Sequence, residues 1–125
     1  SNIANLTATN DFTNNANWDL VLDLKREMFV KMEPLQQKKL MKGNNQVYVE
    51  WTLPEKMFEE YNQLVKSMSY QNWLGVSVSV AVKGQDFNLD LYNLDKKEDY
   101  SKCPRCWFYF KEKALDQLCD SCSND

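Results

Sequence analysis

Hydrophobic residues recur at three- and four-residue spacing from Trp18 onward, which is the period of an amphipathic helix. We expect a long helix from roughly Trp18 to Met41, with Asn17 able to cap its start. Pro34 should kink this helix or remove one hydrogen bond, and Gly43 followed by two asparagines should end it. The apolar stripe is expected to face the core, and it consists of Trp18, Val21, Leu22, Met28, Phe29, Met32 and Leu35.

The pattern then changes to the two-residue period of a strand. Val47, Val49 and Trp51 alternate with polar residues over residues 46–52. Pro54 suits the first turn of a second helix, which we expect to continue to about Met68. The buried face of this helix should contain Met57, Phe58, Tyr61, Leu64, Val65 and Met68.

Two more strands are predicted after the second helix. Residues 73–82 place valines on one face and Ser77, Ser79 and Ala81 on the other, and residues 87–91 alternate in the same way. Gly84 and Asp86 suit a turn between these strands and predict that the strands form an antiparallel hairpin. The predicted fold class is α+β: a long N-terminal helix, then a β-α-β-β two-layer sandwich with helices on one face of the sheet, and a C-terminal zinc-knuckle segment with four cysteines.

All four cysteines lie near the C-terminal end, as two C-x2-C pairs separated by twelve residues. This spacing favours one tetrahedral Zn²⁺ held by Cys103, Cys106, Cys119 and Cys122. An iron centre of rubredoxin type, two disulfides, and a CxxC redox centre are the alternatives. Four protein ligands would leave zinc no open position for water, so the ion would be structural and would drive folding of the tail.

Composition excludes several classes of function. The 125 residues contain no His, which rules out imidazole base catalysis and His-containing triads, and we expect no catalytic site in this chain. A formal charge of −3 is unlike a uniformly basic nucleic-acid binder. No run approaches the roughly 18 apolar residues of a membrane span, so we expect no membrane partner.

The positive charges are nevertheless concentrated. Twelve of the fifteen Lys and Arg residues fall in segments 25–42 and 96–113. In the second segment they alternate with aromatic residues around Trp107, a combination that suits single-stranded RNA, because aromatic rings stack on bases and cations bind phosphates. An ordinary solvated surface beside a metal knuckle is the alternative.

The sequence predicts three parts: a flexible lead-in over residues 1–16, an α/β junction domain over 17–95, and a zinc-binding segment over 96–125. The two basic segments and the knuckle supply the candidate RNA-binding residues, which are Arg105, Trp107, Lys102, Lys111, Lys113, Lys38 and Lys39.

The tail, Lys102-Cys103-Pro104-Arg105-Cys106-Trp107 followed by Leu118-Cys119-Asp120-Ser121-Cys122, resembles the terminal zinc-finger segment of bacterial and mitochondrial isoleucyl-tRNA synthetases. The resemblance continues upstream, where Trp18-Asp19-Leu20 through Lys39 and Gly43 is similar to the helix that follows the anticodon-binding bundle. The strand, helix and hairpin that come next are similar to the junction domain of that family.

This resemblance implies a tRNA-binding C-terminal domain of an isoleucine–tRNA ligase that helps recognise the anticodon stem-loop of isoleucine tRNA. Its partners would be that tRNA and the rest of the synthetase, and we expect the chain to be a monomer. ATP would be used only by the parent ligase, whose class I HIGH and KMSKS signatures are absent here. Only Arg105 and Trp107 occupy matching motif positions, and the lysines are inferred from charge.

The chain also departs from the family pattern. Gln36 stands where another arginine is common, and Phe108-Tyr109-Phe110 is more apolar than usual. Such drift favours a mitochondrial-matrix member over a bacterial cytoplasmic one. A zinc-ribbon protein-interaction module and a thiol oxidoreductase are the competing functions, and an exposed Trp107 would favour base stacking over internal packing.

Overall fold

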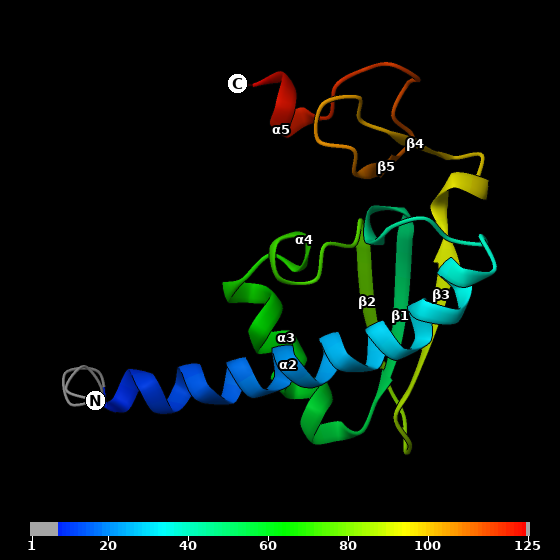
Figure 1. Ribbon diagram of the computed structural model, residues 1–125. Helices are drawn as coiled ribbons and strands as arrows, with labels where there is room; N and C mark the ends of the chain where they lie inside the picture. Colours follow the sequence, from blue (N-terminus) through cyan, green and yellow to red (C-terminus); the bar gives the residue numbers. More distant parts are fainter. Residues whose placement is uncertain (1–7, 125) are drawn as a thin grey trace.

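The computed structural model describes residues 8–124, with side chains from Asn17 onward. The helices are α2 (Ala8–Gln37), α3 (Glu55–Ser67), α4 (Tyr70–Trp73) and α5 (Asp120–Ser123), with short 3-10 helices η1 (Asn44–Gln46) and η2 (Leu94–Lys96). The strands are β1 (Val47–Leu53), β2 (Val78–Lys83), β3 (Asn88–Asn93), β4 (Tyr100–Lys102) and β5 (Tyr109–Lys111). The predicted α+β class is confirmed, and the β4–β5 hairpin with α5 lies beyond one end of the main sheet (Figure 1).

The main sheet has the order β2-β1-β3, with β1 parallel to β2 and antiparallel to β3. The predicted hairpin between the second and third strands is therefore wrong, because β1 separates them. The connection between β2 and β3 passes the end of β1, where the Gly84 N–H donates to the Leu53 carbonyl at 2.9 Å. A Cβ on Gly84 would lie 2.5 Å from Cγ2 of Thr52, so the close crossing requires glycine.

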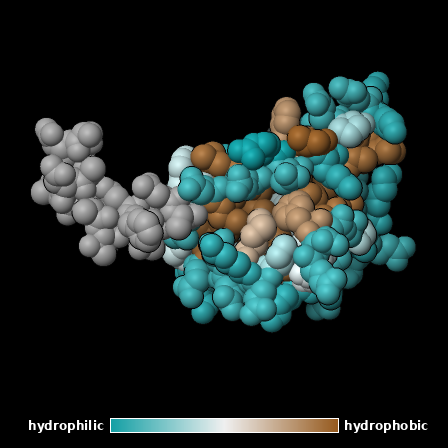
Figure 2. Space-filling view, turned by 90° about the horizontal axis from the view of Figure 1, so that it is seen from below, coloured by the Kyte–Doolittle hydropathy of each residue, from teal (hydrophilic) through white to brown (hydrophobic). Residues whose placement is uncertain are grey.

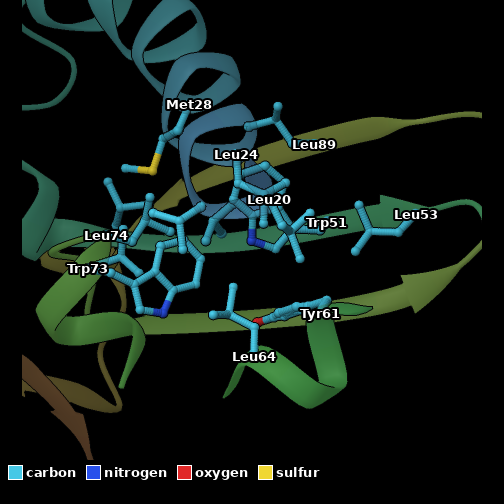
Figure 3. Packing of buried hydrophobic residues seen from close by; sticks show 14 of the residues in the cluster. Leu20, Leu24, Met28, Trp51, Leu53, Tyr61, Leu64, Trp73, Leu74 and Leu89 are labelled. Carbon is cyan, nitrogen blue, oxygen red and sulfur yellow. The ribbon is translucent and has the colours of Figure 1, made fainter. Parts of the chain in front are cut away.

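The main core forms where the two long helices meet β1. Val47, Val49, Trp51 and Leu53 are buried, whereas the residues between them are half-buried, which confirms the predicted alternation. Because all four point to one face, the helices that cover them lie on that face. Figure 3 shows α2 and α3 side chains around Trp51, and the labelled residues of this cluster include Leu20, Leu24, Met28, Tyr61 and Leu64.

The inward face of β2 differs from the face that the valines suggested. Ser79 is buried, whereas Val78 and Val80 are half-buried and Val82 is exposed. The Ser79 hydroxyl accepts a hydrogen bond from Trp51 Nε1 at 3.0 Å and shares one with the Tyr61 hydroxyl at 2.6 Å. A serine fits this core position because it pairs two buried polar groups of aromatic side chains.

Both ends of α2 differ from prediction. The helix begins at Ala8, inside the expected lead-in, so Asn17 cannot cap it; the first seven residues of the lead-in lie outside the described residues. It ends at Gln37 because Lys39 adopts a left-handed conformation with φ of 61°. The Lys39 and Leu40 N–H groups donate to the Gln36 and Leu35 carbonyls, which is a Schellman C-cap. Gly43 is extended and does not end the helix.

The second helix agrees closely with prediction, whereas its connection to β2 does not. Pro54 precedes α3, and Tyr61 and Leu64 of the predicted face are buried, whereas Met68 follows the helix and is exposed. Trp73, expected at the start of a strand, instead belongs to α4 and is buried. None of the described helices is long and apolar enough to cross a membrane.

Candidate metal centre and adjoining basic surface

The four cysteines converge from two local structures. Cys103 and Cys106 lie in the turn of the β4–β5 hairpin, Cys119 caps α5, and Cys122 lies within α5. Their four Sγ atoms all lie within 4.8 Å of one another. A tetrahedral ion with metal–sulfur bonds of about 2.3 Å would set sulfurs about 3.8 Å apart, and the Cys106 and Cys119 sulfurs are 3.8 Å apart. The four cysteines could therefore hold a metal ion.

Backbone hydrogen bonds fix the conformation of the first knuckle, which is the turn that contains Cys103 and Cys106. The Trp107 N–H donates to the Cys103 carbonyl at 2.9 Å, and the Cys103 N–H donates to the Phe108 carbonyl at 2.8 Å. Trp107 closes this turn in a left-handed conformation with φ of 70°. The Cys119 N–H points to the Cys103 sulfur at 3.5 Å, so the second knuckle is joined to the first through a potential ligand atom.

The cysteine pKa values show that these thiols do not ionise equally. Burial raises the pKa of Cys103, but N–H groups of Arg105, Cys106 and Cys119 outweigh it and lower the value to about 5. Burial and contacts with the other sulfurs raise the pKa of Cys122 to about 12. Burial also raises the pKa of Cys106. One thiolate is thus stable alone, whereas four close thiolates need a cation to offset their repulsion.

The donor set fits a structural ion. All four cysteines are free thiols, three are buried, and Cys106 is half-buried. Sulfur atoms alone suit zinc or iron, and four of them complete a tetrahedron without leaving a position for substrate. Among the side chains that the structure describes, no other cluster of Cys, His, Asp or Glu was found that could hold a metal.

Hydrogen bonds attach the cysteine hairpin to the α/β part. The buried Ser77 hydroxyl donates to the Asn45 carbonyl at 2.6 Å and accepts from the Tyr109 N–H at 2.7 Å. The Asn45 amide donates to the Trp107 carbonyl at 2.8 Å. The Tyr109 hydroxyl donates to the Asp95 carboxylate at 2.8 Å. The hairpin is therefore held against the end of the sheet at which β1 and β2 begin.

The two motif residues of the knuckle lie at the surface. Trp107 is 61% exposed, although its Nε1 donates to the Pro104 carbonyl at 3.2 Å. The Lys102 ammonium lies 5.4 Å from the centre of a Trp107 ring. Arg105 is exposed, and its guanidinium donates to the Cys122 carbonyl at 3.3 Å. Trp107 is therefore exposed with one lysine ammonium over its ring, and it is not packed in the core.

The remaining candidate lysines have different surroundings. Lys111 is exposed on β5, whereas the Lys113 ammonium donates to the Ala114 and Gln117 carbonyls and so braces the loop before the second knuckle. Lys38 and Lys39 are exposed just after α2. A shallow cleft places Lys39 with Lys96, so the structure brings the two basic segments together.

Sequence reasoning missed a second cleft, on the face of the sheet that has no helices. It is lined by Tyr48, Glu50, Tyr92, Lys97, Asp99, Tyr100 and Lys111. The alternation in residues 46–52 already placed Tyr48 and Glu50 opposite the core residues, and that signal could have drawn attention to this face.

The fold and the site define a small α+β domain with four clustered cysteines near its C-terminal end that could hold a metal ion. No protein-family model matches the chain. It is similar to an isoleucine--tRNA ligase of Mycoplasmoides gallisepticum, with 30% identity over 102 residues that cover 80% of this chain and 10% of the relative. It is also similar to an isoleucine--tRNA ligase of Campylobacter hominis, with 25% identity over 117 residues that cover 90% of the chain and 12% of the relative. The chain thus spans about a tenth of the length of these relatives, as a segment of such a ligase would.

Proposed function

We propose that this chain is the tRNA-binding C-terminal domain of an isoleucine–tRNA ligase and helps recognise the anticodon stem-loop of isoleucine tRNA. The single observation that carries the proposal is the exposed Trp107 indole, which follows the first cysteine pair and has the Lys102 ammonium over its ring. Similarity to two isoleucine--tRNA ligases supports the choice of tRNA over other RNAs.

Zinc is the proposed ion of the cysteine centre. Its role is structural, because it holds the knuckle that presents Trp107 and orders the segment between the hairpin and α5. Cys103, Cys106, Cys119 and Cys122 are its proposed ligands.

The rest of the synthetase is the second proposed partner. Trp18, Leu22 and Phe29 were predicted to face the core, but they are exposed on the outer side of α2, as is Val30. A groove of about 500 Å³ beside this helix is lined in part by Phe29, Met32 and Leu74. Figure 2 shows hydrophobic side chains at the surface, bordered by hydrophilic ones. Exposed hydrophobic surface often marks a contact with another protein. Because the chain spans only a tenth of its relative's length, the rest of the synthetase is the proposed cover of this surface.

The parent enzyme would use ATP to charge isoleucine tRNA, and a mitochondrial-matrix location remains part of this proposal. The competing proposal is a protein-interaction module without RNA specificity, which the exposed Leu115 in the loop before the second knuckle would serve.

The test is an NMR titration of the zinc-loaded chain with an isoleucine anticodon stem-loop and with the same stem-loop carrying another anticodon. We expect shifts at Arg105 and Trp107 for the isoleucine loop, and loss of the preference in Trp107→Ala. Lys111→Ala should weaken binding to both loops equally, because a phosphate contact does not depend on sequence.

Lys83→Ala is the matched control for Lys111→Ala. It removes one exposed lysine that lies over the Phe58 ring, away from the cysteine hairpin, and should leave binding unchanged. If both stem-loops change the NMR signals of lysines alone, the chain contributes charge without anticodon recognition. If neither loop shifts any residue, the protein-interaction alternative replaces this proposal.

A further inference from the structure

A cleft of about 490 Å³ opens on the face of the main sheet opposite α2 and α3. Tyr48 and Glu50 of β1 and Tyr92 of β3 line its sheet side. Tyr100 and Lys111, which are partners in the β4–β5 register, line its other side. The volume is in the range of small-ligand sites, and the walls come from both parts of the molecule.

Aromatic rings provide an exposed stacking surface in this cleft. Tyr48 and Tyr92 are register partners on neighbouring strands, and their rings meet edge to face with centroids 5.9 Å apart. Tyr92 is 41% exposed, and the Lys97 ammonium lies 5.6 Å from its ring centre. The pair formed by Trp107 and Lys102 has the same arrangement on the cysteine knuckle. In each pair, a lysine ammonium lies over a ring that could stack on a base.

The charged residues of the cleft differ in exposure. Glu50 is half-buried and forms no hydrogen bond or ion pair among the described residues, so its carboxylate is an open acceptor. Lys97 and Lys111 are exposed, as is Asp99. Asp90, the register partner of Glu50, is an exposed carboxylate on β3 outside the lining of the cleft. The Glu50 carboxylate disfavours a phosphate next to it, whereas the two exposed lysines can bind a phosphate and outnumber the exposed Asp99.

A nucleotide can use both the aromatic surface and the two lysines of the cleft. Its uncharged base can lie against the tyrosines, and its phosphate can remain at the lysines. Among the four RNA bases, guanine presents two adjacent N–H donors on its Watson–Crick edge, which match the two oxygens of one carboxylate.

We propose that this cleft binds one unstacked nucleotide of single-stranded RNA, with guanine preferred: Tyr92 stacks on the base, Glu50 accepts from its N–H groups, and Lys97 and Lys111 bind the phosphate. This inference rests on the proposed function as an RNA-binding domain, and it adds a contact separate from Trp107. The distance along the RNA between the two contacts would then be set by the hairpin that joins them.

The test uses the zinc-loaded chain and two single-stranded RNA hexamers, one of uridines and one with a single central guanine. We expect tighter binding of the guanine hexamer, with NMR shifts at the Tyr48 and Tyr92 rings. Tyr92→Leu should weaken guanine-hexamer binding about tenfold or more, because a stacking contact is lost, whereas Tyr92→Phe should retain most of it. Glu50→Gln should abolish the preference for guanine.

Lys97→Ala should weaken binding of both hexamers, and Lys83→Ala is its matched control because Lys83 lies over an aromatic ring outside the cleft. Lys97→Ala also tests the cleft independently of any effect of Tyr92→Leu on folding, since Lys97 is exposed. Binding of 5′-GMP separates a nucleotide pocket from an RNA site: GMP that shifts both tyrosines while the hexamers do not would overturn the RNA assignment.

The outcomes for this cleft and for the proposed function are distinguishable. If Tyr92→Leu and Glu50→Gln leave hexamer binding unchanged while Trp107→Ala abolishes stem-loop discrimination, the cleft is not an RNA site and the proposed function stands. If the cleft variants alter hexamer binding but no stem-loop is discriminated, the cleft assignment stands without anticodon recognition. If no RNA binds, both proposals are wrong.

Discussion

Several single residues hold the backbone in conformations that L-amino acids rarely adopt. Lys39, Trp107, Glu112 and Asp116 all have positive φ values. Three of the four lie in the cysteine-containing segment, where short turns must bring two knuckles together. At Trp107 the left-handed turn directs the chain so that the indole lies outside the knuckle, where it is 61% exposed. Strain at this residue accompanies the feature on which the proposed function depends.

Lys39→Gly tests the cost of one such conformation. Lys39 has φ of 61° at the C-cap of α2, where a side chain costs about 1–2 kcal/mol and glycine costs none of that strain. After the added chain entropy of glycine is subtracted, we expect the free energy of unfolding to rise by about 0.5–1 kcal/mol. Urea unfolding measures the change.

The control is Lys38→Gly, which removes the same charge one residue earlier, where φ is not positive. It should lower stability rather than raise it. Equal effects from the two substitutions would mean that the charge, and not the backbone conformation, determines the result.

At the scale of elements, the sequence predicted what depends on local pattern. The alternation of Val47 and Trp51 specified β1, and the two C-x2-C pairs specified which sulfurs meet. A two-residue period, however, identifies a face of a strand and not its neighbour, so the insertion of β1 between β2 and β3 was missed. The burial of Ser79 was missed for a related reason, since its partners Trp51 and Tyr61 come from other elements.

Ser77→Ala tests the attachment of the cysteine hairpin to the sheet. The substitution removes the hydroxyl that pairs the Asn45 carbonyl and the Tyr109 N–H, both in a part-buried or buried setting. We expect a loss of about 1–3 kcal/mol for unsatisfied groups, and faster hydrogen exchange at the Tyr109 amide. Ser67→Ala, which removes a hydroxyl bonded only to the Leu64 carbonyl at the end of α3, should change stability by less. Unaltered exchange at Tyr109 in the Ser77 variant would show that the hairpin docks by other contacts.

The raised pKa of Tyr109 makes the free energy of unfolding depend on pH in the alkaline range. Burial, then the hydrogen bond to Asp95 and its charge, raise the pKa of Tyr109 from 10 to about 12. Between these values the unfolded chain releases a proton that the folded chain retains, so stability is full below about pH 10 and falls as pH rises toward 12, by about 1–2 kcal/mol after allowance for solvent screening. Tyr109→Phe should flatten this decline in urea unfolding measured from about pH 8 to about pH 11.5. Parallel pH profiles for the two proteins would contradict the assignment.

At the scale of the whole molecule, two separate hydrophobic clusters divide the chain. One contains Trp51 and the faces of α2 and α3, and the other consists of cysteines with Phe110 packed against it. Only the cluster around Trp51 contains many large hydrophobic side chains. We therefore expect the α/β part to remain folded by burial of apolar surface, and the cysteine segment to depend on the proposed zinc ion and on the bonds through Ser77.

Removal of the metal should consequently unfold one part and spare the other. With a strong chelator, we expect the amides of β4 and β5 to lose protection from hydrogen exchange, while the amides of β1 keep theirs, since Trp51 and its neighbours need no ion. Cys103→Ser should reproduce this pattern, because it removes one of four thiolates. Ser121→Ala, in the same knuckle as Cys119 but with no sulfur to lose, is the matched control and should behave as the wild type. Loss of protection in β1 on chelation would mean that the two clusters fold as one unit, and RNA binding at the sheet face would then also require the ion.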